Sequence, residues 1–333
     1  MSGVATPAKR AVSLASIQAP VKARLDRVHP ELLKIVVHGL PAIEAVSGHL
    51  LKRLGKMFRP TLSLLASDIE GKGDDRAITC AAAIELMHLA TLVHDDSVDH
   101  SVKRRGQPTV NALFSHEVSV IMGDFLYSRA LQAMVSLESL EIMRLLTEVS
   151  NELAVGEMRQ LGAIDKLSFD EEGYVALIRS KTGSLLRASC ETGTFFGASR
   201  YRADMARYGE RLGLAFQIAD DLIDYVGDEA VTGKPTGADL KEHKVTLPLI
   251  AGLRKMSPAA RKRVEALFAD PDPSDEHVAE VVSIVAEAGG LEYARQRGNQ
   301  FADEANAALE GLPESPVRAA LADAIVYVMD RRS

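Results

Sequence analysis

The sequence predicts an all-α fold, and three features carry that prediction. From about residue 26 onward, apolar residues recur mostly at helical spacing, as in the segment AITCAAAIELMHLATLVHDD. Ala, Leu, Met and Glu dominate, all of which favour helices, whereas alternating runs of β-branched residues are scarce. The breaks between the helical segments are short. We therefore expect a single large helical bundle of about ten or more helices.

Five breaks rich in Gly, Pro, Asp and Ser separate the expected helices, at residues 71–74, 105–108, 197–199, 227–237 and 271–273. None of them is long enough or low enough in complexity to be a domain linker. Residues 1–25 hold several Lys and Arg, no acidic residue and abundant Ala and Ser. Bacterial leaders and organelle transit peptides share that composition, and we favour the former because no amphipathic pattern is strong there. The expected organisation is a flexible leader over residues 1–25 and one helical domain over residues 26–333.

Composition limits the classes of function. The formal net charge is −7, which argues against general nucleic-acid binding through a basic surface, although a local basic pocket remains compatible with it. Cys80 and Cys190 are too few for a disulfide framework and lack zinc-ligand spacing, so we expect buried thiols in a reducing, cytoplasmic setting. No uncharged apolar run reaches the ~18 residues of a membrane span, so we expect no transmembrane segment.

Acidic residues form two similar clusters. The segment HDDSVD, residues 94–99, is matched by ADDLID, residues 219–224, and each has aspartates at the first, second and fifth positions of a DDxxD pattern. On a helix, these positions lie on or near one face. The six residues are Asp95, Asp96, Asp99, Asp220, Asp221 and Asp224.

Apolar residues precede both clusters, so we expect each cluster at the rim of a cavity. Like charges at this spacing destabilise an isolated helix by about a few tenths of a kcal/mol per pair, and a cation should offset that cost. Mg²⁺ suits such a site because it binds a few carboxylates and completes its shell with water and phosphate oxygens. A solvated charged face is the alternative for one cluster alone, and two copies in apolar surroundings argue against it.

Basic residues follow the first cluster directly: Lys103, Arg104 and Arg105 stand just after it. An anion could then be held by metal on one side and by guanidinium groups on the other, which indicates a polyphosphate ligand. Other basic residues stand in loop-like or helix-end positions, where each alone is more often an ordinary surface residue. They are Lys56, Arg59, Lys181, Lys234 and Lys244.

Other catalytic patterns are missing from the sequence. It has no GxxxxGK[ST] and no strand-borne GxGxxG, so P-loop and Rossmann nucleotide binding are poorly supported. No GxSxG or Cys-His arrangement indicates a nucleophile. His88 lies two helical turns before Asp95, where spacing alone favours a core histidine over a phosphate ligand. Neither His94 nor His243 belongs to an HExxH zinc pattern.

These segments resemble those of the trans-prenyltransferases, the all-E polyprenyl diphosphate synthases of the isoprenoid synthase family. The resemblance covers the chain from about residue 30 to the C-terminus and rests on segments in family order: GKMFRP, ELMHLATLVHDDSVD, KRRGQPT, MGDFLYSRA, KTGSL, FQIADDLIDY and GKPTGADLKEHKVTLPLI. It implies an all-helical fold around a deep central cavity, usually in a homodimer. The implied activity is Mg²⁺-dependent condensation of isopentenyl diphosphate onto an allylic diphosphate, with peripheral membrane contact at product release.

The resemblance also implies roles for particular residues. The six aspartates would hold about three Mg²⁺ ions, which Mn²⁺ could replace, and Lys181 would act with them in catalysis. Residues around the allylic diphosphate would be Arg104, Lys181, Lys234, Lys244, Thr182 and Gln217. Residues around isopentenyl diphosphate would be Lys56, Arg59, His88, Arg105 and Phe216.

The sequence departs from the family pattern at two positions. The first lysine motif commonly reads GKRxRP, and here Met57 replaces its middle Arg, which implies a slightly weakened isopentenyl site. Near the second cluster, EGK is commoner than the Glu242-His243-Lys244 of this chain. His243 would then alter the flexibility of a closing loop, while Lys244 is retained.

Small residues below the first cluster bear on product length. Ala90 and Thr91 lie five and four residues before Asp95, with Met87 one turn deeper, whereas short-chain synthases generally close the cavity there with aromatic side chains. MGDFLYSRA and ELAVGEMRQL also resemble the long-chain branch. The implied product is octaprenyl to decaprenyl diphosphate, as used for quinone side chains, and a farnesyl or geranylgeranyl product is the alternative.

Three rivals remain. A terpene cyclase would have no second substrate, and the retained Lys56, Arg59 and Arg105 speak against it. A non-catalytic subunit of a heteromeric synthase usually loses one aspartate cluster, and this chain keeps both. A purely structural bundle leaves the paired clusters without a cause.

Overall fold

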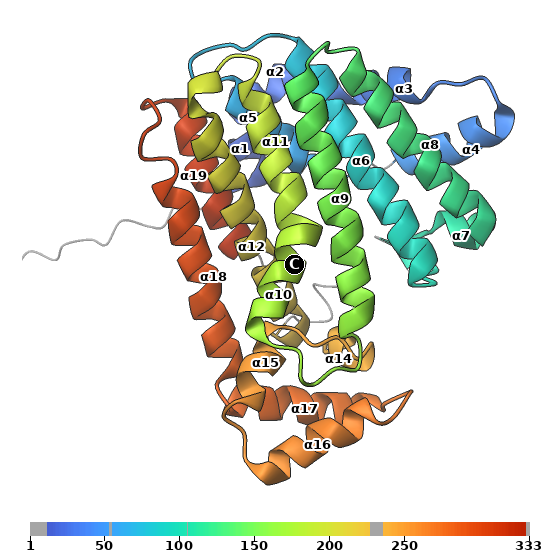
Figure 1. The fold of residues 1–333 in the computed structure, drawn as a ribbon, viewed down its shortest axis with the longest axis vertical. Helices are drawn as coiled ribbons and strands as arrows, with labels where there is room; N and C mark the ends of the chain where they lie inside the picture. The colour runs from blue at the N-terminus through green and yellow to red at the C-terminus, as the bar shows by residue number, and fades with distance from the viewer. Residues whose placement is uncertain (1–11, 53–54, 105, 227–235, 331–333) are drawn as a thin grey trace, which may run out of the picture.

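The computed structural model describes residues 12–52, 55–104, 106–226 and 236–330. Long helices lie side by side along the long axis of the molecule, which confirms the all-α prediction (Figure 1). Within these residues the only sheet is a hairpin of β1 (Lys103–Arg104) and β2 (Gln107–Pro108).

The helices follow one another with short connections. The first half of the chain holds α1 (Leu14–Gln18), η1 (Ala19–Val21), α2 (Lys22–Leu25), α3 (Val28–Val36), α4 (Pro41–Leu51), α5 (Phe58–Ser67), α6 (Arg76–Val98), α7 (Val110–Leu113), α8 (His116–Val135) and α9 (Leu140–Ala163). The second half holds α10 (Glu171–Ile178), η2 (Arg179–Gly183), α11 (Ser184–Thr194), η3 (Ser199–Tyr201), α12 (Arg202–Val226), α14 (Ala238–Lys241), α15 (Leu247–Leu253), α16 (Pro258–Phe268), α17 (Asp275–Glu287), α18 (Gly290–Ala307) and α19 (Pro316–Met329).

Helix α6 lies at the centre of the bundle and packs against α3, α5, α8 and α11. Its first four turns are apolar nearly all round, which is the pattern of a helix buried on every side. Among the described helices it alone has the length and composition to cross a membrane, but 72% of that apolar window is buried inside the bundle. The helix is therefore the core of the fold, and its last turn brings the first aspartate cluster to the end of that core.

Glycines allow α11 to approach its two neighbours closely. A Cβ on Gly193 would lie 2.1 Å from the Ser63 carbonyl oxygen of α5, and a Cβ on Gly209 of α12 would lie 2.5 Å from the Leu186 carbonyl oxygen. Both contacts are with backbone, which cannot swing aside as a side chain can. The glycines thus set the spacing of the central helices.

The predicted flexible leader over residues 1–25 is wrong for residues 14–25, which form α1, η1 and α2. Ile17, Val21 and Leu25 are buried in the common core, and α1 packs against α19. Buried Arg24 donates to Ser67 Oγ at 2.9 Å and to the Asp74 carbonyl at 2.6 Å. These helices were not predicted because their apolar residues are few and widely spaced. Contacts with the rest of the bundle stabilise the helices.

Three of the predicted breaks connect helices: residues 71–74 join α5 to α6, residues 197–199 follow α11, and residues 271–273 join α16 to α17. The break at residues 105–108 contains β2, with Arg105 outside the described residues, and the break at residues 227–237 lies mostly outside the described residues. Connections such as residues 164–170 and 242–246 were not predicted.

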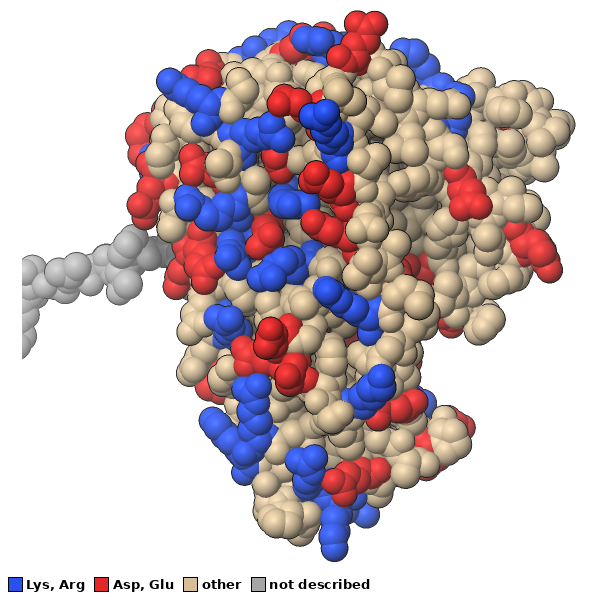
Figure 2. Space-filling model, viewed as in Figure 1, with Lys and Arg blue, Asp and Glu red and all other residues tan. Residues whose placement is uncertain are grey.

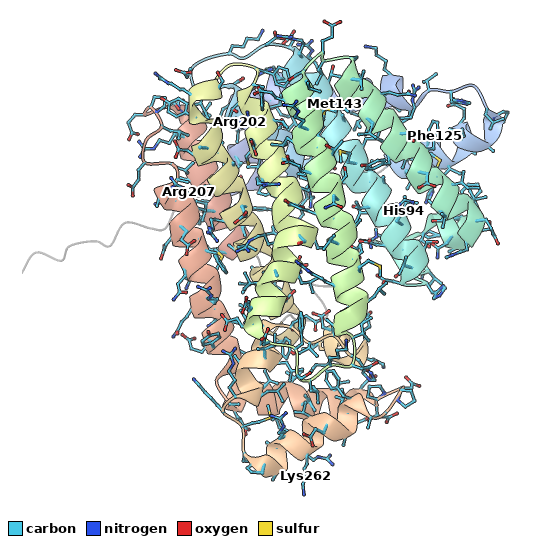
Figure 3. All side chains as sticks on the ribbon, viewed as in Figure 1. His94, Phe125, Met143, Arg202, Arg207 and Lys262 are labelled. Atoms are coloured by element: carbon cyan, nitrogen blue, oxygen red, sulfur yellow. The ribbon has the colours of Figure 1, made fainter. Side chains whose placement is uncertain are left out.

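Both aspartate helices end at the same end of the bundle. Arg202, at the start of α12, lies at the opposite end of the molecule from Lys262 of α16, and α6 and α12 both run toward the α16 end (Figures 1 and 3). Cys80 and Cys190 are buried free thiols, as predicted, and burial raises the pKa of Cys80 to about 12.

Candidate active site

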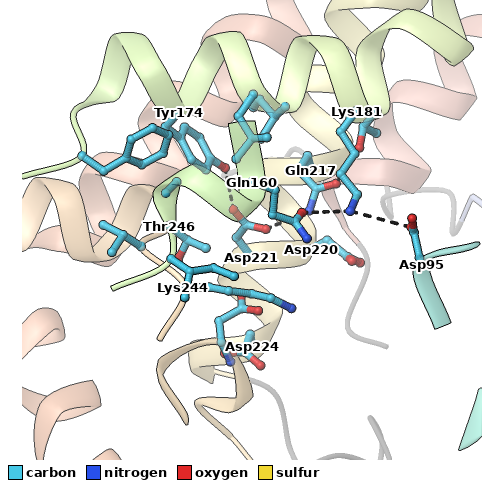
Figure 4. Close-up of a pocket in the computed structure, with 18 of the residues that line it drawn as sticks. Asp95, Gln160, Tyr174, Lys181, Gln217, Asp220, Asp221, Asp224, Lys244 and Thr246 are labelled. Carbon is cyan, nitrogen blue, oxygen red and sulfur yellow. Dashed lines mark hydrogen bonds and ion pairs between the residues drawn. The ribbon is translucent and has the colours of Figure 1, made fainter. Parts of the chain in front are cut away.

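A cavity of about 500 Å³ opens where α6, α9 and α12 end, close to α10 and α14 (Figure 4). Its wall combines basic side chains, apolar side chains and an unusual number of carboxylates. The carboxylates belong to Asp95, Asp99, Asp220, Asp221, Asp224 and Asp239. The structure thus brings five of the six predicted aspartates together and adds one that was not predicted.

The carboxylates of the two DDxxD clusters lie at the C-terminal ends of α6 and α12, where an anion is unfavourable. Asp95 is in the last turn of α6, Asp99 is its C-cap, and the second cluster occupies the last two turns of α12. The C-terminus of a helix carries partial negative charge, so anions there are destabilised. Burial raises the pKa of Asp95, against the lowering effect of Lys181, and Asp99 raises it further. The arrangement indicates that cations normally share this site.

Asp96 is the predicted aspartate that does not line the cavity. Its Oδ1 accepts a hydrogen bond from Arg104 Nε at 2.8 Å, and its side chain is buried. Burial raises the pKa of Asp96, and Arg104 opposes that rise. This geometry does not support the predicted direct contact between Asp96 and a metal ion. The Asp96 carboxylate is turned toward Arg104 and holds that guanidinium at the cavity wall.

Asp221 is held by two neutral donors. Tyr174 Oη donates to Asp221 Oδ2 at 2.6 Å, and Gln217 Nε2 donates to Oδ1 at 2.9 Å (Figure 4). Thr182 Oγ1 donates to Gln217 Oε1 at 2.8 Å, which extends the network to α11 through η2. Burial raises the pKa of Asp221 to about 7, even though both hydrogen bonds lower it. Thr182 and Gln217 thus lie at the cavity as predicted, whereas Tyr174 was missed.

Asp239 is the carboxylate that sequence analysis missed. It is the second residue of α14, and its backbone N–H donates to Asp224 Oδ2 at 3.1 Å. Burial raises its pKa well above the ordinary value, and Asp221 and Asp224 add to the rise. It stands fifteen residues beyond Asp224, outside any DDxxD pattern, so only the return of α14 toward α12 reveals it.

Lys181 lies between the two clusters on a π-helical turn, η2, that interrupts the continuous helix from α10 to α11. Its Nζ donates to Gln160 Oε1 at 2.8 Å and lies 3.7 Å from Asp95 Oδ2 (Figure 4). It also donates to Glu157 Oε2 at 3.0 Å. Such turns are frequent at functional sites because they re-aim a side chain. Glu157 and Gln160 lie in the ELAVGEMRQL segment, which had been linked only to product length.

Lys244 reaches the cavity from the connection after α14, beside Asp224 (Figure 4). Burial alone would lower its pKa, but the carboxylates of Glu242, Asp239 and Asp99 outweigh that effect and raise the pKa. The ammonium group is therefore charged at the cavity wall, and its contact with a diphosphate stays a prediction.

A second group of predicted residues lies away from this cavity. Phe216 of α12 stacks on Phe58 at the start of α5, with ring centroids 6.4 Å apart, and Phe58 contacts Tyr327 of α19. The Lys56 ammonium lies 5.9 Å from the centre of the Tyr327 ring. Met57, the departure from GKRxRP, has a left-handed backbone at φ 52° and caps α5.

Several predictions remain untested. Arg105 and Lys234 lie outside the described residues. Arg59 and His88 are half-buried and do not line the cavity. Met87 and Ala90 are buried in the core around α6, and Thr91 donates to the His88 carbonyl at 2.8 Å. The cavity does not extend to these three, so their role in product length stays a prediction.

The donor set fits a hard divalent cation. The acidic side chains that line the cavity offer carboxylate oxygens as metal ligands, and no His or Cys, the ligands typical of zinc, lines it with them. Within the described residues, no three of His, Cys, Asp and Glu converge closely enough to hold an ion by themselves. A cation here would need further oxygen ligands, which substrate phosphates and water supply for Mg²⁺.

Fold and site together define an all-helical bundle with a cavity at one end that is suited to a diphosphate, because carboxylates able to bind hard cations and basic side chains line it together. Comparison with known families identifies its class. The polyprenyl synthetase family model matches residues 40–285, and the chain belongs to that family. Its members are prenyltransferases, and the predicted family and enzyme class are thereby confirmed.

Individual relatives agree. Octaprenyl diphosphate synthase of Escherichia coli (strain K12) is 40% identical over 270 residues, which cover 80% of this chain and 83% of that protein. The crystal structure of a decaprenyl diphosphate synthase from Rhodobacter capsulatus matches with a TM-score of 0.87 at 35% identity, covering 96% of this chain and 98% of that one. A polyprenyl synthase from Caulobacter crescentus CB15, complexed with calcium and isoprenyl diphosphate, matches with a TM-score of 0.91 at 30% identity, covering 98% and 100%.

Proposed function

We propose that this chain condenses isopentenyl diphosphate successively, head to tail, onto an allylic diphosphate and forms a long-chain all-trans polyprenyl diphosphate. One observation carries the proposal: two carboxylate clusters from α6 and α12 meet at one cavity, with Lys181 and Lys244 between and beside them. Geranyl, farnesyl and geranylgeranyl diphosphates are the candidate starters.

The allylic diphosphate binds at the charged wall of the cavity. Asp95, Asp99, Asp220, Asp221 and Asp224 would hold about three Mg²⁺ ions, replaceable by Mn²⁺, at this wall. Lys181 and Lys244 donate to the same diphosphate. When bound, the metal ions supply Lewis-acid stabilisation of the departing diphosphate.

The chain's own residues then serve an ionisation. The ammonium groups of Lys181 and Lys244 stabilise negative charge as the allylic C–O bond breaks. The alkene of isopentenyl diphosphate attacks the allylic carbocation, forming the new C–C bond, and a proton is then lost to the released diphosphate. No protein nucleophile takes part. Apolar cavity residues such as Phe169 and Ile178 help to exclude water, which would otherwise capture the cation.

Isopentenyl diphosphate, the second substrate, binds among the side chains where α5, α12 and α19 meet. Lys56 and Arg59 lie at the start of α5, and Phe216 packs against that start through Phe58. Basic groups there would hold the diphosphate of isopentenyl diphosphate while the aromatic side chains shield its apolar part. Arg105 and His88 complete the proposed set.

The names of the relatives support a long product, because octaprenyl and decaprenyl synthases share the fold and a third or more of the sequence. We place the product at eight to ten isoprene units, for use in quinone side chains, and the enzyme in the cytoplasm. A short-chain product of the farnesyl or geranylgeranyl type is the less supported alternative.

An apolar surface over α8 and α9 supports the proposed homodimer. Ile121 of α8 is 67% exposed and Met158 of α9 is 69% exposed, and Val118, Val155 and Leu161 are exposed as well. The side of the molecule where α8 lies shows few charged side chains (Figure 2). A large apolar patch of this kind is typical of a subunit interface.

The test is an incubation of purified protein with Mg²⁺, farnesyl diphosphate and labelled isopentenyl diphosphate, followed by chromatography of the dephosphorylated products. Products up to eight to ten isoprene units are expected. A stop at three or four units would keep the chemistry and reject the long product. Failure to incorporate label from any allylic starter would make a non-catalytic subunit the better assignment.

A further inference from the structure

Two connections that line one side of the cavity also meet behind it. Ala163 and Ile164, where α9 ends, line the cavity, and so do Lys244, Val245 and Thr246 after α14. The residue after Ile164 is Asp165, and the residue before Lys244 is His243. Asp165 and His243 do not line the cavity themselves, and they join the two connections to each other.

The contact between them is double. His243 Nδ1 and Asp165 Oδ1 lie 2.5 Å apart, and the Asp165 backbone N–H donates to the His243 carbonyl at 3.2 Å. The imidazole also stacks on Phe268, the last residue of α16, with ring centroids 5.2 Å apart and planes 26° apart. The His243 side chain is only 13% exposed, whereas that of Asp165 is 59% exposed. The connection after α9, the connection after α14 and helix α16 therefore contact one another through the His243 imidazole.

The backbone at both residues is left-handed, with φ 62° at Asp165 and φ 55° at His243. Side-chain-bearing residues adopt this region at a cost, and the surrounding contacts must hold them there. Glycine would adopt it freely, and glycine is the commoner residue at position 243 in the pattern EGK. A histidine at a position suited to glycine indicates that its side chain contributes something that offsets the strain.

The position of Lys244 follows from this arrangement. The His243 N–H donates to the Leu240 carbonyl at 3.1 Å, and the Lys244 N–H donates to the Asp239 carbonyl at 2.8 Å. The turn between them is thus tied to α14 on one side and, through His243, to the α9 connection on the other. With its backbone fixed at both sides, Lys244 has less freedom to leave the cavity.

We propose that His243 and Asp165 form a strap that positions Lys244 for the allylic diphosphate. This inference rests on the function proposed above. His243 is a positioning residue and touches neither substrate. Loss of the strap should weaken binding of the allylic diphosphate while leaving the isopentenyl site, which lies among α5, α12 and α19, unaffected.

The experiment compares His243→Gly, Asp165→Gly and the double variant with wild type. Glycine removes the side chain without adding backbone strain at a positive φ. The KM for farnesyl diphosphate should rise about tenfold in each single variant, or about 1.4 kcal/mol of binding, while the KM for isopentenyl diphosphate stays within about twofold. The double variant should show no further rise, because both substitutions remove the same contact. His243→Asn, which tolerates a left-handed backbone and retains a donor toward Asp165, should restore most of the lost affinity.

His277→Ala is the matched control, since the His277 imidazole also makes a hydrogen bond between helices, with the Arg263 carbonyl at 3.1 Å, but lies on α17 outside the cavity. It should leave both KM values unchanged. Unchanged KM values in His243→Gly, or an equal rise in both with a lowered melting temperature, would overturn the strap. Calorimetric titration of farnesyl diphosphate with Mg²⁺ separates the two claims. A wild type that binds without condensing refutes the proposed function, and the loss of affinity in His243→Gly still decides the strap.

Discussion

Tyr174→Phe isolates the support that holds the second aspartate cluster. The substitution removes one oxygen from a buried side chain, the hydroxyl that donates the 2.6 Å hydrogen bond to Asp221. Phenylalanine keeps the ring and therefore the packing of α10 against α12. The change should alter the orientation and charge of Asp221 and little else.

The size of the effect follows from the burial of this pair. A hydrogen bond to a charged group contributes about 1.5–3 kcal/mol, and about 1.4 kcal/mol corresponds to a factor of ten. Asp221 is proposed to take part in cation binding together with the neighbouring carboxylates. Loss of its hydrogen bond in Tyr174→Phe should therefore lower turnover at fixed Mg²⁺ by about 10- to 100-fold. The Mg²⁺ concentration for half-maximal rate should rise, because an unsupported Asp221 binds a proton more readily.

Steady-state rates across a Mg²⁺ series measure this, with circular dichroism to check folding. Tyr208→Phe is the matched control: Tyr208 is equally buried and donates to the Leu321 carbonyl at 2.9 Å, away from the cavity. Its removal should lower stability by about 1 kcal/mol without changing the Mg²⁺ response. A Tyr174→Phe enzyme with wild-type rate and Mg²⁺ dependence would show that the Tyr174–Asp221 bond has no part in the site.

Further predictions concern other levels of the structure. Asp95→Asn should lower turnover by several orders of magnitude with an unchanged melting temperature, and near-normal turnover would break the metal assignment. Burial raises the pKa of Asp221 to about 7, so the native metal-free protein binds more protons than the unfolded chain between pH 4 and 7, and its stability should fall as pH rises through that window. Denaturant unfolding with a chelator at pH 5 and pH 7.5 measures the fall, which Asp221→Asn should reduce. Gly193→Ala places a Cβ 2.1 Å from the Ser63 carbonyl oxygen and should cost at least about 2 kcal/mol of unfolding free energy, and a neutral result would refute the close packing of α11 on α5. Ala90→Phe should shorten the polyprenol product on chromatography, and an unchanged length would place the end of the product elsewhere.

Much of this protein was predictable from local pattern. Helical spacing and helix-forming composition predicted the all-α bundle, because the apolar residues on the buried face of a helix recur at intervals of three and four residues. The aspartates of α6 and α12 were identifiable since DDxxD places its carboxylates on one helical face. Gly- and Pro-rich breaks marked some of the connections, and the cysteines are buried thiols as composition predicted.

The rest depended on contacts between segments far apart in the chain. Asp239, Tyr174 and Glu157 carry no pattern that separates them from ordinary residues, and they belong to the site because α14, α10 and α9 end beside it. The helices over residues 14–25 form against α19 and α5 although their own apolar pattern is weak.

Two residues show where the boundary lies. Asp96 and Asp95 are neighbours in the same motif, yet one is turned toward Arg104 and the other faces the cavity. The sequence determined that both carboxylates stand at the end of a helix, because spacing along one helix is a local property. Which carboxylate faces the cavity and which receives a guanidinium was decided only by the tertiary structure, since electrostatic partners are chosen by distance in space.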